Sequence, residues 1–220
     1  MDDTRVRVLP FDRGPVETIG YLIVDLLAGS ALVIDVPFQS AGDILATLAE
    51  QGWELTAIAI THGHWDHTGD AASLAGATGA PVSIHRLDEA MLVTPQSYGF
   101  ALPFPLRGMT PDRLLEHGDV LVCGSLRFEV LHVPGHTPGH VALFERSEGI
   151  LFTGDVLFRG SIGRTDLPGG SYDVLLDSIV TQILSLPDET RVYPGHGSDT
   201  SIGRERKNNP YILDYLDHFE

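Results

Sequence analysis

Ten histidines occur in this chain of 220 residues, and the densest group lies at residues 62–67. The string His62-Gly63-His64-Trp65-Asp66-His67 directly follows a short apolar run, 56–60, of the kind that forms a buried strand. Residues two apart in an extended segment point the same way, so His62 and His64 can reach one metal ion. Asp66 and His67 fall where the chain turns into the next helix, and they can face a second ion. The string predicts a metal site.

Three further segments share one form, an apolar strand followed by a glycine and then a ligand-type residue. They end in His136, Asp155 and His196, and the tripeptide Pro-Gly-His occurs twice among them. A residue at the carboxyl end of a strand is aimed into the crevice at the sheet edge, and the glycine permits close backbone approach. The four segments together predict a single cluster of seven candidate ligands: His62, His64, Asp66, His67, His136, Asp155 and His196.

The composition of this cluster indicates the metal chemistry. Five imidazoles and two carboxylates without a thiolate suit zinc, iron or manganese. Seven ligands exceed the needs of one tetrahedral ion and fit two divalent ions with a carboxylate between them. Two ions about 3.5–4 Å apart can hold a bridging hydroxide, a nucleophile that is available near neutral pH.

In order and spacing, these seven residues resemble the metallo-β-lactamase superfamily. The resemblance includes the strings Thr61–His64, Pro134–His140 and Tyr193–Gly197, extends over nearly the whole chain, and is nearest to the short glyoxalase II-like hydrolases. It implies an α+β fold, a four-layer αββα sandwich of two mixed sheets with helices outside, as one domain over residues 1–220. It also implies a partition of the ligands. A first ion would be held by His62, His64 and His136, a second by Asp66, His67 and His196, with Asp155 bridging.

The function implied by the resemblance is cleavage of a small-molecule thioester such as S-lactoylglutathione by a metal-bound hydroxide, with zinc the expected metal. Asp66 is the candidate catalytic residue, because it can orient the hydroxide as well as bind metal. Arg164, Asp166 and His140 are the candidate substrate contacts. Arg164 stands where the family has a lysine that contacts the thiol, whereas Asp166 does not replace the family's tyrosine, which argues against strict glutathione specificity. His140 is alternatively a hydrogen-bonded residue behind the ligands.

Other functions share these motifs. The stretch Gly163–Asp166 also resembles the mononuclear iron persulfide dioxygenases, but Pro194-Gly195-His196-Gly197 and His140 depart from their pattern. A lactonase needs the same hydroxide and stays open. A metal-bound sensor module is the non-enzyme alternative, and retention of all seven ligands argues against it. A β-lactamase would carry an export signal, which we do not find at the N-terminus.

Net charge and composition limit the kinds of binding partner and the cellular compartment that we expect. Fourteen Lys and Arg against 30 Asp and Glu give a net charge of −16, so nucleic acid is not an expected partner. The single cysteine, Cys123, excludes an intramolecular disulfide and fits a reducing compartment. Without a signal peptide or a long apolar run, we expect a cytoplasmic protein with no membrane partner. The oligomeric state is not predicted.

The sequence pattern alternates between predicted strands and predicted helices, and these elements must position the seven candidate ligands. Strands are predicted at 5–9, 18–26, 31–36, 56–60, 81–84, 126–133, 140–144, 150–153 and 191–193. Helices are predicted at 41–51, capped by Ser40 and stopped by Gly52, and at 70–76, 86–91 and 172–184. Residues 93–114 form a proline-rich loop, whose role as a lid is open and whose aromatic residues Tyr98, Phe100 and Phe104 could cover an acyl group.

The residues left over receive structural interpretations. The resemblance implies that Asp35, at the end of a predicted strand, supports the metal loop as a structural residue. Ordinary surface or strand-end positions are expected for the remaining histidines: His85, His117, His132 and His218.

Overall fold

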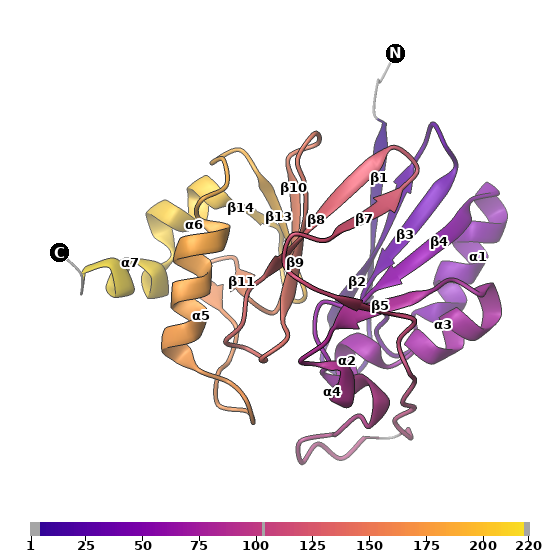
Figure 1. Cartoon of the computed structure of the whole chain (residues 1–220), viewed down its shortest axis with the longest axis horizontal. Coiled ribbons are helices and arrows are strands. Elements are labelled where there is room, and N and C mark those ends of the chain that lie inside the picture. Colours follow the sequence, from indigo (N-terminus) through magenta and orange to yellow (C-terminus); the bar gives the residue numbers. More distant parts are fainter. Residues whose placement is uncertain (1–4, 103, 218–220) are drawn as a thin grey trace.

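A computed structural model describes residues 5–102 and 104–217, in which two six-stranded sheets face each other (Figure 1). The first sheet has the strands in chain order: β1 (Val6–Arg13), β2 (Thr18–Asp25), β3 (Ser30–Ile34), β4 (Glu54–Ala59), β5 (Val82–His85) and β6 (Arg113–Leu115). Its first three strands are antiparallel, and β3 to β6 run parallel.

The second sheet has the order β14-β13-β10-β9-β8-β7. Its strands are β7 (Val120–Cys123), β8 (Leu126–His132), β9 (Val141–Glu145), β10 (Ile150–Gly154), β13 (Arg191–Pro194) and β14 (Thr200–Ser201). Only β10 and β13 pair in parallel, so this sheet is mixed as well. A short hairpin of β11 (Leu157–Phe158) and β12 (Ser161–Ile162) lies beside it.

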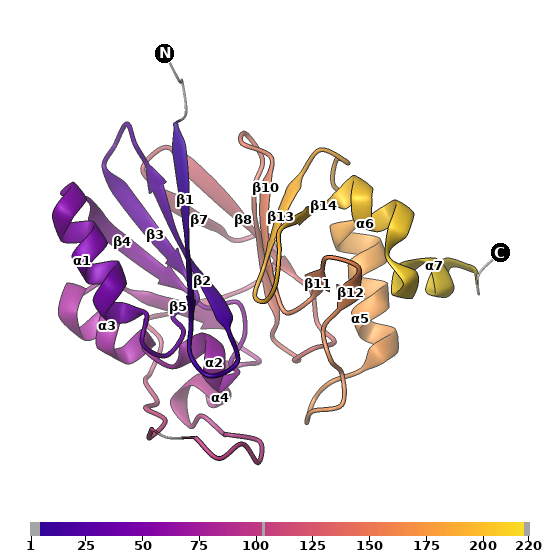
Figure 2. The ribbon, with the colours of Figure 1, turned by 180° about the vertical axis from the view of Figure 1, so that it is seen from behind.

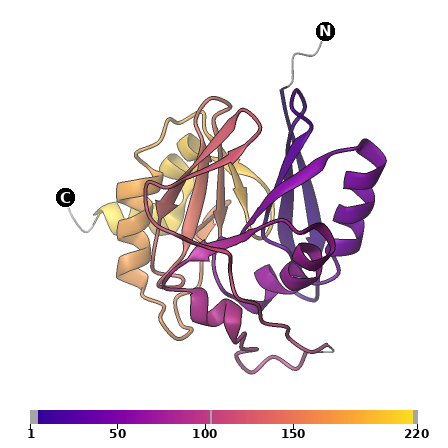
Figure 3. The ribbon, with the colours of Figure 1, turned by 45° about the vertical axis from the view of Figure 1, so that its right-hand side comes forward.

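Helices cover the outer face of each sheet. Figures 1 and 2 show α1 (Ala41–Gln51) and α3 (Ala71–Thr78) outside the first sheet. Outside the second sheet lie α5 (Tyr172–Ser178), α6 (Ile202–Asn208) and α7 (Pro210–Asp217). The short helices α2 (Trp65–Thr68) and α4 (Glu89–Val93) lie near one end of the sheets, and Figure 3 shows the chain after α4 looping along the lower edge of the molecule. The four-layer αββα sandwich is confirmed.

Buried apolar side chains fill the three spaces between the four layers. In β2, Leu22 points to the helix side and Ile23 to the space between the sheets, and both are fully buried. Covering a strand on both faces favours the continuous apolar run that the sequence has there. Phe128 and Phe152 fill the space between the sheets, whereas Phe144 packs under the helices of the second half.

The predicted strands all occur, and the differences lie in the short elements. The predicted loop 93–114 is shortened because Arg113 already begins β6. The helix expected at 86–91 begins only at Glu89, and the helix expected at 172–184 continues beyond α5 as a π-helix, Ile179–Ile183. The sequence did not predict β6, β7, β11, β12, β14, α2, α6 or α7. His218 lies outside the described residues, and a single domain over 1–220 stays a prediction.

The prediction that the Ser40 side chain caps α1 was wrong. The Ser40 hydroxyl donates to the carbonyl of Pro37 at 2.6 Å and makes no capping bond. Instead, Ala41 N–H donates to Asp70 Oδ2 at 3.1 Å. The predicted stop is confirmed, because Gly52 is left-handed (φ 68°) and its N–H bonds the carbonyl of Leu48.

Cys123 ends β7 and is fully buried, with its thiol 3.3 Å from the carbonyl oxygen of Ser30. Burial raises the pKa of this thiol to about 11. Among the residues described, no helix has the length and apolar character needed to cross a bilayer.

Candidate metal centre

The four predicted segments meet at one end of the two sheets. Residues 62–67 follow β4 and enter α2, and His136 lies in the connection from β8 to β9. Asp155 follows β10, and His196 follows β13. Since each segment leaves the same end of its sheet, residues far apart in the chain become neighbours. The structure brings together all seven side chains that the sequence singled out.

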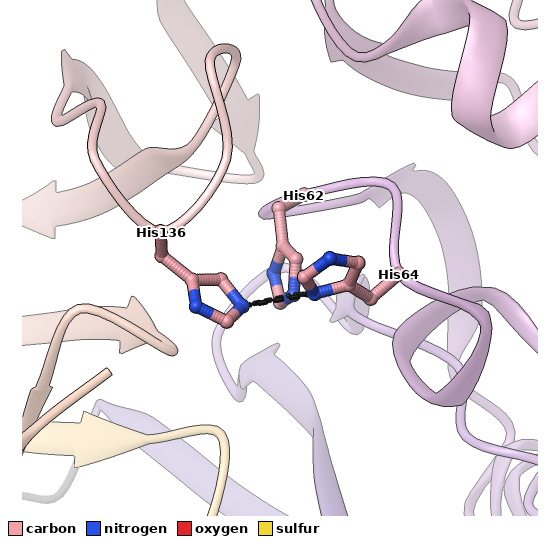
Figure 4. Close-up of side chains that lie close together, drawn as sticks. All are labelled: His62, His64 and His136. Carbon is pink, nitrogen blue, oxygen red and sulfur yellow. Dashed lines mark hydrogen bonds between the residues drawn. The ribbon is translucent and has the colours of Figure 1, made fainter. Parts of the chain in front are cut away.

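Three imidazoles form the most buried part of the cluster, and Figure 4 shows their rings pointing toward one another. His62 Nε2 lies 3.0 Å from His64 Nδ1, and His136 Nε2 lies 2.9 Å from His64 Nδ1 and 3.2 Å from His62 Nε2. Ligand nitrogens on a tetrahedral ion are ~3.3 Å apart when each metal–nitrogen bond is ~2.0 Å. This spacing fits one ion.

The remaining candidates lie directly beside these imidazoles. His67 Nε2 is 3.5 Å from Asp66 Oδ2 and 3.3 Å from Asp155 Oδ1. His196 Nε2 is 3.4 Å from Asp66 Oδ2 and 3.5 Å from Asp155 Oδ2. Asp155 Oδ2 also lies 3.8 Å from His136 Nε2, so this carboxylate faces both groups.

Two buried atoms of this second group have no hydrogen-bond partner among the described residues, namely His67 Nε2 and Asp155 Oδ1. Buried polar atoms without a partner are costly, and a cation between them would satisfy both. The donor set and these unpaired atoms fit a second metal ion.

Hydrogen bonds behind the rings fix which nitrogen faces the cluster. His67 Nδ1 lies 2.7 Å from Asp35 Oδ2, and His136 Nδ1 lies 2.7 Å from the carbonyl oxygen of Arg164. With Nδ1–H donating to an oxygen, Nε2 keeps its lone pair for a metal. Asp35 also accepts bonds from Thr61 N–H and its hydroxyl at 2.8 and 2.7 Å, so it supports the metal loop as predicted.

Thr18 is a supporting residue that the sequence analysis missed. Its hydroxyl donates to Asp66 Oδ2 at 2.8 Å from the start of β2. A single threonine at a strand start carries no motif, so only the fold reveals this contact.

Burial and neighbouring charges shift the pKa values of the candidate ligands in different directions. Burial, together with neighbouring imidazoles, lowers the pKa of His64 to about 3 and holds that of His62 well below its usual value. The pKa of His196 is raised to about 10, because hydrogen bonds to Asp155 and Asp66 outweigh its desolvation by burial. For Asp155, attraction to His67 and His196 outweighs desolvation by burial, so its pKa lies well below the ordinary range. The carboxylates therefore attract positive charge, and the rings of His62 and His64 stay neutral.

All seven residues of the cluster lie within a match to a known protein family. The protein-family model described as the metallo-beta-lactamase superfamily matches residues 16–196. The chain belongs to the metallo-β-lactamase superfamily. Its His/Asp clusters are typical of the binuclear metal site of that superfamily.

Individual members of the superfamily cover most of the chain. A curated relative, hydroxyacylglutathione hydrolase GloC of Haemophilus influenzae, is 38% identical over 83% of this chain and 87% of its own length. The crystal structure of the BLEG-1 B3 metallo-β-lactamase superposes with a TM-score of 0.87 at 35% identity, covering 94% of this chain and 99% of that one. The crystal structure of TTHA1623 in a di-iron-bound form superposes with a TM-score of 0.78 at 39% identity, covering 93% of this chain and 100% of that one.

A cavity of about 140 Å³ opens over the cluster. Its polar wall includes Asp66, Asp155 and His196, and its apolar wall includes Trp65 and Phe100. Tyr98, which like Phe100 comes from the proline-rich loop, lines it too, and the covering of an acyl group by these rings stays a prediction. Phe104 does not: its ring stacks on Phe38 at 3.5 Å between centroids. A larger cavity of about 770 Å³ lies between β1, β2 and β13 and contains none of the predicted site residues.

The three predicted substrate contacts lie in different places. Arg164 lines the cavity and is bound by Asp166 through two bonds of 2.7 and 2.8 Å, with both side chains exposed. His140 is fully buried, and its Nε2 accepts a bond of 3.0 Å from the backbone N–H of Asp155. Its assignment as a substrate contact was therefore wrong. The alternative, a hydrogen-bonded histidine behind the ligands, agrees with this position, although the ring accepts a bond here.

The described histidines that are not candidate ligands differ in their exposure to solvent. His117 is exposed, with its Nδ1 accepting from His132 N–H at 3.2 Å. His85 and His132 end β5 and β8, as expected of strand-end residues. His85 is nevertheless buried, and the two rings stack at 4.1 Å. Burial, together with His132, lowers the pKa of His85 to about 4.

Proposed function

We propose that this chain is a binuclear metallo-hydrolase that cleaves small-molecule thioesters, with zinc as its metal. His62, His64 and His136 would hold the first ion, whereas Asp66, His67 and His196 would hold the second and Asp155 would bridge. The observation that carries this proposal is the approach of seven imidazole and carboxylate side chains at one sheet end. The thioester substrate is supported by the 38% identity to a hydroxyacylglutathione hydrolase.

The chain's own residues place and shield the reaction. Two divalent ions, when bound, supply Lewis acidity and lower the pKa of a water molecule toward neutrality. Asp66 sits between Thr18 and His196, which fixes its carboxylate at the floor of the cavity, where it can orient that water. Trp65 and Phe100 form an apolar wall beside it, which suits an acyl group and excludes bulk water.

The size and charge of the cavity limit the substrate. A volume of about 140 Å³ admits a small acyl group, and a larger thiol must extend outside. Arg164 lines the cavity, and its exposed guanidinium can attract an anionic thiol carrier once Asp166 is displaced. Because Asp166 neutralises the arginine, we expect weak and tolerant recognition of the thiol.

The test is steady-state kinetics of the zinc-loaded protein on a panel of thioesters. S-lactoylglutathione should be hydrolysed with a high KM, and changes in the thiol part should matter little. Arg164→Ala should raise KM more than it lowers kcat, because the guanidinium touches the carrier and not the carbonyl. Exposed Arg107→Ala, from the proline-rich loop, is the control that should change neither constant.

A second candidate, β-lactam hydrolysis, is favoured by the TM-score of 0.87 to the BLEG-1 enzyme. A chromogenic cephalosporin, a lactone and glutathione persulfide therefore belong in the panel. Turnover of the cephalosporin or lactone without thioester cleavage would replace the proposed substrate class. Oxygen consumption with the persulfide would support the dioxygenase, and absence of any turnover would support the sensor module.

A further inference from the structure

The three histidines of the first group, His62, His64 and His136, come from loops of two different sheets. His62 and His64 lie on the loop after β4 of the first sheet, whereas His136 lies on a loop of the second sheet. Ring nitrogens from the two loops nevertheless approach to 2.9 Å and 3.2 Å. Something must hold the loops of two different sheets at a fixed distance.

Asp88 contacts both loops. Its Oδ2 accepts a hydrogen bond of 3.0 Å from Gly63 N–H, between His62 and His64. The same carboxylate accepts the Thr137 hydroxyl at 2.6 Å and Gly139 N–H at 2.7 Å, on the loop that carries His136. One side chain therefore receives three donors from two sheets, each within three residues of a candidate ligand.

This use of the carboxylate differs from what its position in the chain favours. Asp88 is the N-cap residue of α4, where an aspartate side chain ordinarily accepts a bond from its own helix. Here the side chain makes no capping bond. It is fully buried, and among the described residues no arginine or lysine forms an ion pair with it. Burying a carboxylate costs free energy, which the three bonds to the loops offset.

Two glycines allow both loops to approach Asp88. A β-carbon on Gly139 would lie 2.6 Å from both the backbone nitrogen and Oδ1 of Asp88. A β-carbon on Gly63 would lie 2.4 Å from the β-carbon of Met91, one turn further along α4. Both loops are thus packed against the start of α4 at distances that only glycine permits.

A second buried aspartate provides a comparison. Asp25 is also fully buried and accepts backbone N–H bonds from Leu27 at 2.9 Å and Ser125 at 2.7 Å, along with the Ser125 hydroxyl. It joins the same two sheets, but at the opposite ends of their strands, far from the candidate ligands. Asp25 and Asp88 are thus both buried aspartates that accept hydrogen bonds across the two sheets, and of the two only Asp88 bonds to the metal loops.

We propose that Asp88 is the positioning residue that sets the distance between the His62/His64 loop and the His136 loop, and thereby the affinity and geometry of the first metal ion. This proposal rests on the metal site of the proposed function. It does not depend on which substrate is hydrolysed.

The experiment titrates Co²⁺ into metal-free protein and follows the visible absorption of the ion, whose intensity and wavelength report coordination geometry. In Asp88→Asn, an amide NH₂ replaces one acceptor oxygen opposite the loop donors. We expect binding of the first Co²⁺ to weaken by about 10- to 100-fold, with an altered spectrum. Asp25→Asn should lower the melting temperature and leave the affinity and spectrum of the first Co²⁺ unchanged.

A milder pair of variants covers the case in which Asp88→Asn does not fold. Thr137→Val removes one of the three donors, and Thr137→Ser keeps the hydroxyl. We expect weaker Co²⁺ binding with valine and restoration with serine. Wild-type affinity in folded Asp88→Asn or in Thr137→Val would overturn the proposal, as would equal losses in Asp25→Asn and Asp88→Asn. Wild-type protein that binds Co²⁺ but cleaves no thioester would overturn only the proposed function.

Discussion

At the scale of single residues, most candidate ligands are oriented by a contact behind them. Asp35 holds His67, the carbonyl of Arg164 holds His136, and Thr18 holds Asp66. Such supports place ring nitrogens and carboxylate oxygens before any ion arrives, which reduces the ordering cost of binding. Asp155 Oδ1 and His64 Nε2 are buried without a hydrogen-bond partner among the described residues. The Asp155 carboxylate also faces both groups.

The first prediction at this scale concerns Asp155. Asp155→Asn keeps the shape of the side chain and removes the negative charge between two cation sites, so repulsion between the ions is less compensated. We expect hydrolysis to fall by more than about 100-fold and one equivalent of zinc to be lost, with the fold retained. Elemental analysis and steady-state kinetics measure both effects. His117→Ala, at an exposed position, should be close to wild type, and a comparable loss there would contradict our division of the histidines.

At the scale of elements, the loops owe their shape to what packs against them. Gly135 precedes His136 with φ 130°, and a β-carbon there would lie 2.3 Å from the backbone nitrogen and Cα of Leu175 in α5. The N–H of Ser171, just before α5, bonds the Gly135 carbonyl at 2.8 Å. Helix α5 therefore fixes the path of the loop that carries His136.

A substitution at Gly135 tests this dependence. Gly135→Ala must displace α5 or the loop, so we expect a loss of more than about 3 kcal/mol in the free energy of unfolding and weaker binding of the first metal. Gly149→Ala is the matched control, since φ is 63° and no atom lies within 4 Å of its β-carbon. Backbone strain alone should cost the control about 1–2 kcal/mol without affecting metal binding. Denaturant unfolding and metal titration measure the two effects, and equal metal affinities in both variants would contradict this role of α5.

The sequence predicts those parts of the fold and site that local patterns determine. The strand before His62 is a continuous apolar run, and the Pro-Gly-His strings mark strand ends, so the elements and the cluster could be predicted together. Asp88 and Thr18 could not, because their partners lie far along the chain and their own neighbourhoods have no pattern. His140 was misassigned for the same reason: only the packed structure shows that its ring lies behind Asp155. The two-residue strands β11, β12 and β14 are too short for any period to be visible.

At the scale of the whole molecule, the site lies where the two sheets meet. The first sheet supplies His62 to His67, and the second supplies His136, Asp155 and His196. Metal ions that bind all of these residues would join the two halves. Binding to the folded state alone adds free energy according to the ratio of free metal to its dissociation constant.

We therefore expect metal to stabilise the entire chain. Free zinc at 100 times its dissociation constant should add about 2.7 kcal/mol per site to the free energy of unfolding, and a chelator should remove it. Thermal melts of zinc-loaded and metal-free protein measure the shift. His117→Ala should keep the full shift and Asp155→Asn only part of it. A melting temperature that zinc does not change would contradict a site shared by both sheets.

The division of the site between the halves also sets the order of events on the ribosome. Four candidate ligands emerge within residues 62–67, but His136 follows about seventy residues later and His196 sixty after that. During synthesis, the early histidines are thus exposed without the partners that complete either group. We therefore expect the first group to bind an ion only after His136 has emerged and its loop has docked, and a nascent chain stalled before His196 would still lack a complete second group.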